Sequence, residues 1–316
     1  MSVCGPFPLV CVIVLNHNGR RHLEYCLPSL LATDYPSMHL LLVDNASQDG
    51  SATWVRERFP GVEIIESPVN RGWAGGNNLG IARAQELGAG YIALANNDIR
   101  VHPAWLRAAV QAAETDRRIG IVGFQIYDAQ GSGETAAFEE AVRGWQGPSW
   151  RPAEVVDGMA MLVRASLFDA LGPIDEGFFA YAEDNDLVIR ARRAGYRVIQ
   201  VNVPVWHYGG GTFGERLLWA ARLQIRNNLR LALKHEPPAG VLYQLARHFA
   251  KGCLPFVRVN PHDFAARRLR PSHPIVNFGI WLYAVGWNIR HLPATLRQRR
   301  LEQQRIAAAR RQWDEK

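Results

Sequence analysis

The stretch HLLLVDNASQDGS, residues 39–51, joins a continuous apolar run to a polar loop and then to the start of a helix-length segment. Its apolar residues do not alternate with polar ones, which is typical of a strand buried on both faces. The loop places carboxylate, amide and hydroxyl groups directly after that strand. This combination predicts one strand of a parallel sheet, flanked by helices, with polar groups at its carboxyl end.

Four other apolar runs have the same form, and helix-length segments separate them. The expected strands cover 9–15, 39–44, 62–67, 91–96 and 119–124, and the expected helices cover 21–31, 51–59, 75–87 and 103–113. Pro103 favours a helix start, because proline fits the first turn. The alternation predicts an α/β fold with a mixed, mostly parallel sheet flanked by helices.

The alternation ends after Asp128. Residues 129–152 contain Gly, Ser and Trp without a clear period, so we expect a long loop or lid there. Beyond it we expect a strand over 154–164, helices over 165–171 and 183–194, and a strand over 196–208. Gly195 suits a helix C-cap, and the glycines at 209–211 predict a mobile loop.

Charge divides the chain into two parts. Residues 1–219 carry 18 Arg and 24 acidic residues, a net charge of −6, whereas residues 220–316 carry 18 basic and 5 acidic residues, a net charge of +13. We therefore predict a domain over 1–215, with halves of about 1–128 and 129–215, and a basic helical region over 216–316. A basic block binds either an anionic membrane surface or nucleic acid. No recognition helix or RNA-binding signature is evident, so we expect no nucleic-acid partner.

The most apolar stretch covers residues 275–289, and its 15 residues fall short of the about 20 that span a bilayer. Its aromatic residues Trp281, Tyr283 and Trp287 precede the basic segment HLPATLRQRR. Two interpretations remain open: a helix lying in the membrane interface, or an ordinary packed helix with a solvated basic tail.

Cysteine usage bears on the compartment. Cys4, Cys11, Cys26 and Cys253 have no paired spacing, which predicts reduced thiols. The first apolar run follows no positively charged segment, so we expect no signal peptide. These features predict a cytoplasmic protein, and the basic region predicts a peripheral location on the inner face of the cytoplasmic membrane.

Polar residues follow the expected strands at one edge of the sheet, where open α/β sheets bind ligands. Neither the GxGxxG dinucleotide fingerprint nor the P-loop motif is present, which disfavours an NAD enzyme and a P-loop NTPase. Aspartate can accept from a base N–H, asparagine can bond a ribose, and arginine can neutralise phosphate. The nucleotide-binding candidates are Asn16, Asp44, Asn45, Arg71, Gly72, Asn77, Asn78, Asn96 and Asn97.

Five motifs in this order resemble those of family 2 glycosyltransferases, which have the GT-A fold. They are VIVLNHNG (12–19), LLVDNASQDGS (41–51), NRGWAGGNNLG (70–80), LANND (94–98) and FFAYAEDNDLVIRARRAGYRV with VPVWHYGGGTFG (178–198 and 203–214). The resemblance covers residues 8–214 and points to the branch of bacterial rhamnosyltransferases and galactofuranosyltransferases. The resemblance implies a Rossmann-like GT-A catalytic domain. It is specific because five motifs match in the expected order.

The resemblance implies transfer of a sugar, with inversion, from a nucleoside diphosphate donor to a hydroxyl of a glycan or lipid-linked acceptor in cell-envelope polysaccharide synthesis. The expected donor is dTDP-rhamnose, with UDP-galactofuranose or UDP-N-acetylglucosamine as alternatives. It also implies a divalent metal, Mg²⁺ or Mn²⁺, held by Asp98 and His207. Asn96 and Asn97 stand where the family often has a first carboxylate. That departure leaves a non-catalytic nucleotide-sugar or polysaccharide-binding protein as the alternative function.

Three carboxylates, Glu183, Asp184 and Asp186, open the expected helix over 183–194. The spacing predicts that Asp186 pairs with Arg190 on the surface, for a few tenths of a kcal/mol. Asp184 instead begins an inward apolar face, where partial desolvation raises the pKa of a carboxyl group. The resemblance implies that Asp184 is the catalytic base and Glu183 its supporting neighbour. The expected acceptor-side residues are Asp157, Tyr181 and Trp206.

Overall fold

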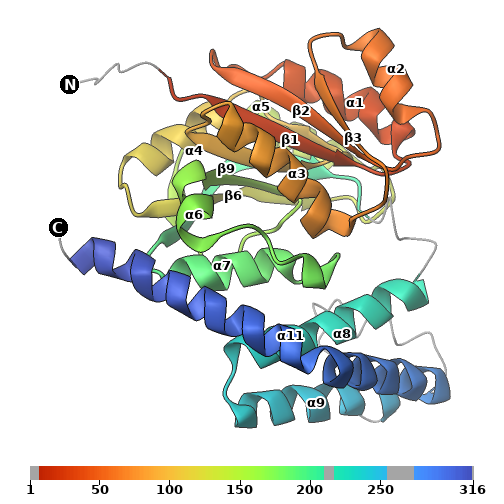
Figure 1. Ribbon diagram of the computed structural model, residues 1–316. Coiled ribbons are helices and arrows are strands. Elements are labelled where there is room, and N and C mark those ends of the chain that lie inside the picture. The colour runs from red at the N-terminus through yellow and green to blue at the C-terminus, as the bar shows by residue number, and fades with distance from the viewer. Residues whose placement is uncertain (1–6, 210–216, 255–273, 315–316) are drawn as a thin grey trace.

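The computed structural model describes residues 7–209, 217–254 and 274–314 (Figure 1). The positions 210 and 211 of the expected mobile loop, and Cys4, lie outside these ranges. Within them, nine strands form one mixed sheet in the order β3-β2-β1-β4-β8-β6-β9-β5, with β7 paired to β9. The strands are β1 (Val10–Asn16), β2 (Met38–Asn45), β3 (Glu63–Ser67), β4 (Tyr91–Asn96), β5 (Ile99–Val101), β6 (Ile119–Asp128), β7 (Trp150–Pro152), β8 (Ala160–Arg164) and β9 (Arg197–His207).

The first four strands in this order are parallel, as the continuous apolar runs predict. β8 is antiparallel to both β4 and β6, whereas β6 and β9 are parallel. The expected α/β fold with a mixed, mostly parallel sheet is therefore confirmed.

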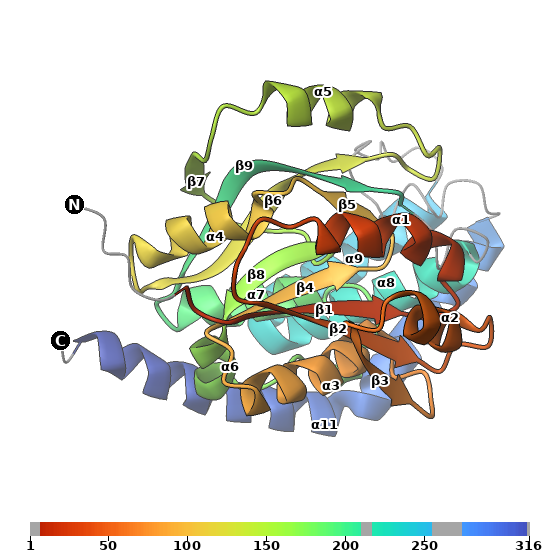
Figure 2. The same ribbon diagram turned by 90° about the horizontal axis from the view of Figure 1, so that it is seen from above.

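Helices cover both faces of the sheet (Figure 2). They are α1 (Arg20–Leu31), α2 (Ser51–Arg58), α3 (Gly72–Glu86), α4 (Trp105–Glu114), α6 (Ala165–Leu171) and α7 (Glu183–Arg193). Residues of β1 alternate between the two cores: Val10, Val12 and Val14 pack with α1 and α4, and Cys11 and Ile13 pack with α3, α6 and α7. The sheet is thus buried on both sides, and its carboxyl edge is left for polar residues.

Two expectations between residues 129 and 164 are corrected. The segment expected as a loop contains helix α5 (Ala136–Gly144) and strand β7, although α5 buries only Phe138. The strand expected over 154–164 begins only at Ala160. In the first half, the Gly158 N–H donates to the Asp184 carboxylate instead of to a neighbouring strand.

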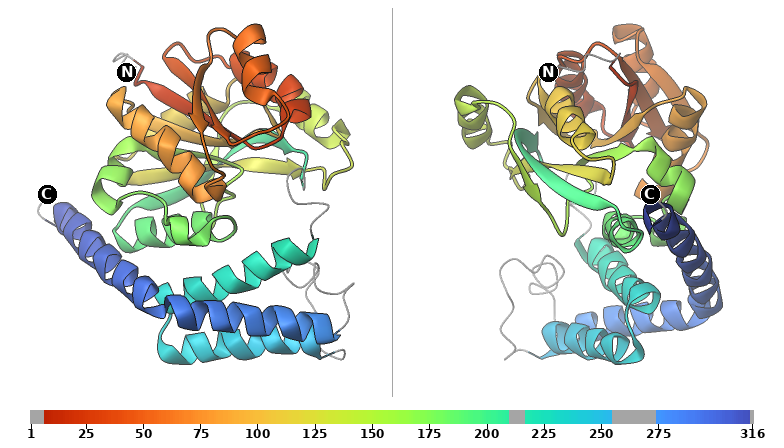
Figure 3. Two further views of the ribbon diagram at one scale, coloured as in Figure 1. Left: turned by 45° about the vertical axis from the view of Figure 1, so that its right-hand side comes forward. Right: turned by 90° about the vertical axis from the view of Figure 1, so that its left-hand side faces the viewer.

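The C-terminal part is helical and forms a separate layer below the sheet, made of α8 (Leu217–His235), α9 (Pro238–Cys253) and α11 (Pro274–Asp314) (Figure 3). α11 passes along α8 and α9 and continues against α6 and α7. Ile280 and Ala284 of α11 pack on Ala221, Ile225 and Leu229 of α8. The stretch 275–289 is therefore a packed helix on one face. Among the described helices, none has the length and apolarity needed to cross a membrane.

Candidate active site

The nucleotide-binding candidates from β1, β2 and β4 lie together at the carboxyl edge of the sheet. Asn16 lies opposite Asp44 in the parallel β1–β2 pair, and its Nδ2 donates to Asp44 Oδ2 at 3.2 Å. On the other side, Asn97 Nδ2 donates to Asn16 Oδ1 at 2.7 Å. Register alone brings these residues together, because the carboxyl ends of parallel strands meet at one edge.

Asn45 shapes the loop that enters α3. Its Nδ2 donates to Asn70 Oδ1 and to the Gly72 carbonyl, both at 3.0 Å, and its Oδ1 accepts from the Arg71 N–H at 2.9 Å. Arg71 is exposed, so its guanidinium is available to an anion. Gly72 has a φ of +70°, and a Cβ there would lie 2.3 Å from the Phe179 carbonyl oxygen. The donor half and the loop before α7 are thus in close contact.

The asparagines of α3 and β4 differ in how their polar atoms are used. Asn78 accepts from the Ile174 N–H and donates to the Ile174 carbonyl and to Glu176 Oε1, so it holds a loop. Asn77 is buried, and its Oδ1 has no hydrogen-bond partner among the described residues. Asn96 is partly exposed and accepts from the Trp73 Nε1–H at 3.1 Å. Asn77 and Asn96 therefore keep more capacity for a ligand than Asn78 does.

Asp98 and His207, the expected metal ligands, come together because Ile99 lies opposite His207 in the β5–β9 pair. Asp98 Oδ1 is 3.4 Å from His207 Nε2. Asp128, which the sequence reasoning missed, lies beside His207 at the end of β6, and its Oδ1 is 3.4 Å from His207 Nδ1. The imidazole therefore lies between two carboxylates.

This donor set fits a divalent cation. Burial alone would lower the pKa of His207, but the Asp128 and Asp98 carboxylates outweigh it and raise that pKa to about 9. Without a bound cation, protonated His207 thus offsets the negative charge of the carboxylates. A metal cation can replace that proton. Carboxylate oxygens combined with imidazole nitrogen suit Mn²⁺ better than Mg²⁺. Asp98 and His207, through Nε2, are the residues that could hold the metal, whereas Asp128 faces the other ring nitrogen, where it can orient the imidazole.

Glu183 and Asp184 begin α7 but have different surroundings. Asp184 is partly exposed, and it accepts from the N–H groups of Gly158 at 3.1 Å and Asn185 at 2.7 Å. Burial raises the pKa of Asp184, those hydrogen bonds oppose the shift, and the charge of Asp157 raises it further. Glu183 is buried, and the described residues offer its Oε2 no hydrogen-bond partner. Burial and the Asp184 charge raise the pKa of Glu183 to about 8.

Asp186 pairs with Arg190 as predicted, at 2.8 Å, but the expected surface position is wrong because both side chains are fully buried. The C-terminal helices cover the pair: Asp186 Oδ1 lies 2.6 Å from Lys234 Nζ and 2.8 Å from His235 Nε2. Burial alone would raise the pKa of Asp186, but Lys234 and Arg190 hold it far below its usual range. The pair belongs to a buried ionic network, which no helix periodicity could have predicted.

Asp186, His235 and Glu302 have ligand atoms within 4.8 Å of one another, a grouping that would suit a metal. Lys234 already fills the space between these carboxylates, with Nζ 2.6 Å from Asp186 Oδ1 and 2.8 Å from Glu302 Oε1. Arg190 adds a second positive charge. A divalent cation there would face two fixed cations, so we assign this cluster to structural ion pairing.

The expected acceptor-side residues occupy unlike positions. Asp157 is exposed, and its charge interacts with both Asp184 and His207. Tyr181 is partly exposed in the loop before α7. Trp206 is only 4% exposed, and its Nε1–H donates to the Glu134 carbonyl. Asp157 and Tyr181 are thus open to a ligand, whereas Trp206 mainly packs.

Taken together, a mixed sheet with this strand order, a polar carboxyl edge and acidic residues at the start of α7 define a glycosyltransferase of the GT-A fold. A mannosyltransferase from Pyrobaculum calidifontis, solved with GDP-Man and Mn²⁺, superposes with a TM-score of 0.57 and 18% identity, covering 99% of this chain and 92% of that chain. The superposition supports the fold.

The model of the family described as glycosyl transferase family 2 matches residues 11–162. An N-acetylglucosaminyl-diphospho-decaprenol L-rhamnosyltransferase of Mycobacterium tuberculosis is 31% identical over 238 residues, which is 65% of this chain and 77% of the relative. A galactofuranosyltransferase of Mycolicibacterium smegmatis is 35% identical over 96 residues, 29% of this chain and 30% of the relative. The chain belongs to glycosyltransferase family 2 and is a glycosyltransferase, as the sequence motifs predict.

Proposed function

We propose that this glycosyltransferase inverts the anomeric centre of a nucleoside diphosphate sugar, and that Asp184 is the base that takes the proton of the acceptor hydroxyl. The observation that carries the proposal is the convergence of charged groups. Asp157 interacts electrostatically with Asp184 on one side and with His207 on the other. A base and a diphosphate-side cation site must lie close to one reacting centre, and a carboxylate whose charge acts on both Asp184 and His207 supports that arrangement.

The chain's own residues divide the chemical work. Asp184 has a raised pKa, which makes its carboxylate a stronger base toward a hydroxyl. The carbonyl-rich loop before it faces the donor half through the Phe179 and Gly72 contact. Arg71 is exposed at the donor edge and can pair with a phosphate. A divalent cation held by Asp98 and His207 would supply positive charge for the leaving diphosphate, with Asp128 orienting the imidazole.

Replacing the base tests the mechanism. We expect Asp184→Asn to lower turnover roughly 10²- to 10⁴-fold while donor affinity stays within about twofold, because only the proton acceptor is lost. Steady-state kinetics and donor titration measure the two effects. Asp169→Asn, an exposed carboxylate on α6, is the matched control. Near-normal turnover of Asp184→Asn would remove Asp184 from this role.

For the donor we propose dTDP-rhamnose, because the Mycobacterium tuberculosis relative is named an L-rhamnosyltransferase. UDP-galactofuranose is the alternative that the Mycolicibacterium smegmatis relative supports. Thermal unfolding against a panel of nucleotide sugars, with and without Mn²⁺, separates them, since only a bound ligand stabilises the fold. Chelation by EDTA should suppress transfer and Mn²⁺ should restore it. Unchanged transfer in EDTA would contradict the metal proposal.

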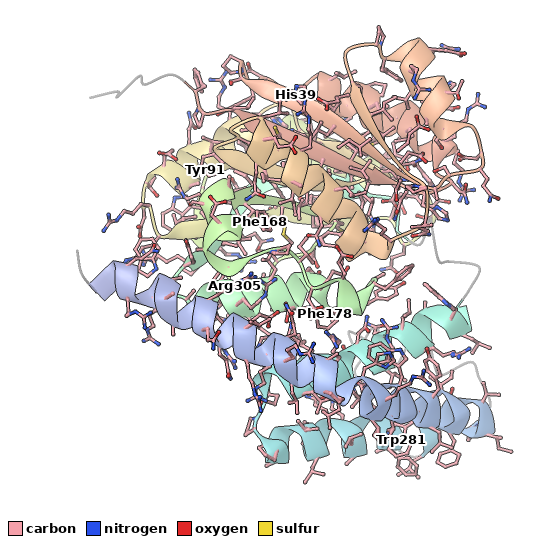
Figure 4. The ribbon with its side chains drawn as sticks, in the orientation of Figure 1. His39, Tyr91, Phe168, Phe178, Trp281 and Arg305 are labelled. Carbon is pink, nitrogen blue, oxygen red and sulfur yellow. The ribbon has the colours of Figure 1, made fainter. Side chains whose placement is uncertain are left out.

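For the acceptor we propose a glycan, lipid-linked at the inner face of the cytoplasmic membrane, with the protein bound there peripherally. The relative's name places its own substrate on a decaprenol diphosphate. In this chain, α9 and α11 expose apolar side chains at the end of the molecule farthest from the sheet, where Trp281 also lies (Figure 4). Exposed apolar and basic residues on one helical layer suit an anionic lipid surface.

A further inference from the structure

Asn227 lies in the middle of α8, is fully buried, and points at the loop that precedes Asp184. Its Nδ2 lies 2.8 Å from the Phe178 carbonyl oxygen, 2.7 Å from that of Ala180 and 2.8 Å from that of Tyr181. One side-chain amide thus reaches the backbone of three residues within a four-residue span. Family-model residues 11–162 do not include α8, so this contact lies outside the matched region.

The orientation of the Asn227 amide is fixed from its other side. Arg226 Nε donates to Asn227 Oδ1 at 2.8 Å, which leaves Nδ2 to face the carbonyl groups. The Arg226 guanidinium also lies 4.3 Å from the ring centre of Trp287 on α11, and it donates to the Phe178 carbonyl. α11 therefore holds Arg226, and Arg226 holds the amide of Asn227.

The loop needs such support because its backbone is unusual. Phe179, Tyr181 and Ala182 have φ values of 67°, 73° and 72°, and none of them is glycine. Side chains with a Cβ rarely adopt this left-handed region, so the surrounding structure must hold each residue there. Ala182 is also the N-cap of α7, and Asp184 is only two residues further on.

Other contacts hold the same loop at its flanks. The Ala74 N–H of α3 donates to the Phe179 carbonyl at 3.2 Å, which fixes the donor side. Phe178 lies buried between the sheet-containing part and the C-terminal helices (Figure 4). Lys234 and Arg230 of α8 lie over its ring, at 5.2 and 5.4 Å. Asn227 bonds to the central carbonyl groups of both Ala180 and Tyr181.

We propose that Asn227 is a positioning residue, which holds the left-handed backbone at 179–182 so that the Asp184 carboxylate is placed for the acceptor hydroxyl. This inference rests on the proposed role of Asp184. If it holds, the C-terminal helices position the loop that carries the base, in addition to any contact with a membrane. Misplacing a catalytic group by a small distance is enough to lower turnover strongly.

Asn227→Ala tests the proposal in the full-length protein. We expect turnover to fall at least about tenfold, with the donor KM within about twofold, because the Ala74 N–H separately holds the donor side of the loop at the Phe179 carbonyl. Amide hydrogen exchange of the peptide over 178–186 should become faster, while peptides of β1 and β2 stay unchanged. The exchange measurement reports loop order independently of which residue is the base.

Asn202→Ala is the matched control. Asn202 of β9 is also a side-chain amide that holds a backbone segment, because its Nδ2 donates to the Gly147 carbonyl and its Oδ1 accepts from the Ser149 N–H. We expect it to lower the thermal midpoint without the loss of turnover. Equal turnover of the two variants, or unchanged exchange over 178–186 in Asn227→Ala, would overturn the positioning role.

The same measurements separate this inference from the proposed base. If Asp184→Asn keeps its turnover but Asn227→Ala still loosens the loop and lowers turnover, Asp184 is not the base and the loop positions another group. If Asp184→Asn is inactive and Asn227→Ala is fully active with an ordered loop, the base stands and the positioning role is lost.

Discussion

Glu183 and Asp184 are neighbours in sequence, yet their environments give the two carboxyl groups different protonation states. Glu183 is 5% exposed, and burial raises its pKa to about 8, so it carries a proton at neutral pH. Asp184 is partly exposed and accepts two backbone hydrogen bonds, which favour its charged form. A neutral Glu183 adds no second negative charge, and the proton-accepting role remains with Asp184.

The raised pKa of Glu183 predicts how stability depends on pH. Between its ordinary value of 4.5 and about 8, the folded protein holds a proton that the unfolded chain releases. This group therefore destabilises the fold progressively as pH rises through that window, by at most about 1.4 kcal/mol per pH unit. Glu183→Gln should remove the effect, and its advantage over wild type in urea unfolding should grow from pH 5 to pH 8. A pH-independent difference would contradict the assignment.

Asp128 carries a second prediction at this scale. Asp128→Asn should weaken Mn²⁺ binding about 10- to 100-fold, because the carboxylate beside His207 Nδ1 orients the imidazole. Titration of Mn²⁺ in the presence of a nucleoside diphosphate, followed by electron paramagnetic resonance, measures this affinity directly. Glu139→Gln, an exposed carboxylate on α5, is the control. Unchanged affinity in Asp128→Asn would leave Asp98 and His207 as the candidate ligands.

A site residue could be predicted from the sequence only where neighbouring residues in the chain determine its position. Asn16, Asp44 and Asn96 could be grouped from the sequence because strand ends share an edge in a parallel sheet. Asp98 and Asp184 needed the motif resemblance, and their roles are still predictions. Asp128 lies just beyond the expected strand end, so only the β6–β9 register placed it beside His207.

At the scale of elements, the start of α3 is fixed by the close approach of two backbones. Gly72 has a φ of +70°, and a Cβ at that position would lie 2.3 Å from the Phe179 carbonyl oxygen. Gly88, just after α3, has a φ of +71°, but a Cβ there would meet nothing within 4 Å in the described part of the chain. The two glycines thus share a backbone conformation and differ only in surroundings.

The comparison of these glycines gives a matched pair of variants. Gly88→Ala should cost about 1 kcal/mol, which is the strain of a left-handed alanine. Gly72→Ala should cost more, by roughly 1–3 kcal/mol, because the loop before α7 must also move. Guanidinium unfolding measures both free energies. Equal losses would show that the Phe179 contact does not constrain α3.

α8 is joined to α7 by buried charges, which predicts a large effect for a single lysine. Lys234 Nζ is 2.8 Å from Asp175 Oδ2, 2.6 Å from Asp186 Oδ1 and 2.8 Å from Glu302 Oε1. Lys234→Met should destabilise the protein by about 3–5 kcal/mol, because it leaves buried carboxylates without their cation. Urea unfolding measures this loss.

An exposed pair supplies the comparison for Lys234. Arg56 and Glu66 pair on the surface with side chains 56% and 58% exposed, so Arg56→Ala should cost at most about 1 kcal/mol. Similar losses in Lys234→Met and Arg56→Ala would contradict a stabilising role for the buried network. The periodicity of α7 predicts the Asp186–Arg190 pair, but burial comes from helices more than forty residues away.

Secondary structure could be predicted from the sequence where the pattern of apolar residues was strong. The five continuous apolar runs became β1 to β4 and β6, because they fill two cores at once. α5 buries only Phe138, and the Gly and Ser residues on both sides of it favoured a loop in the sequence. Residues 154–159 are not part of β8, and the Gly158 N–H among them donates to Asp184, a long-range contact that no short-range signal in the sequence predicts.

For the whole molecule, charge and apolar exposure are both concentrated in the C-terminal layer. α9 and the first half of α11 lie farthest from the sheet (Figure 1). They expose Leu242 and Tyr243 on α9 and Phe278 and Leu282 on α11. Arg290, Arg297 and Arg300 are exposed further along α11. α8 joins this layer to the loop before α7 through Asn227, so a membrane bound to the layer would lie at a fixed distance from that loop.

This arrangement predicts binding to anionic vesicles by both apolar insertion and charge. Arg290→Gln, Arg297→Gln and Arg300→Gln together should weaken binding at least about tenfold, because each arginine near a negative surface contributes about 1 kcal/mol. The loss should shrink as salt rises, since salt screens the charges. Flotation with phosphatidylserine vesicles at several salt concentrations measures it.

The apolar contribution is tested by Phe278→Ser with Leu282→Ser, which should weaken vesicle binding at every salt concentration because hydrophobic burial is not screened. Val69→Ser with Val155→Ser is the control, since these side chains are 57% and 61% exposed but belong to the sheet-containing part. If only the control pair lost binding, the lipid-facing surface would lie on the sheet-containing part. If the wild-type protein did not bind vesicles but retarded an oligonucleotide in a gel-shift assay at the same salt concentration, the basic region would bind nucleic acid instead.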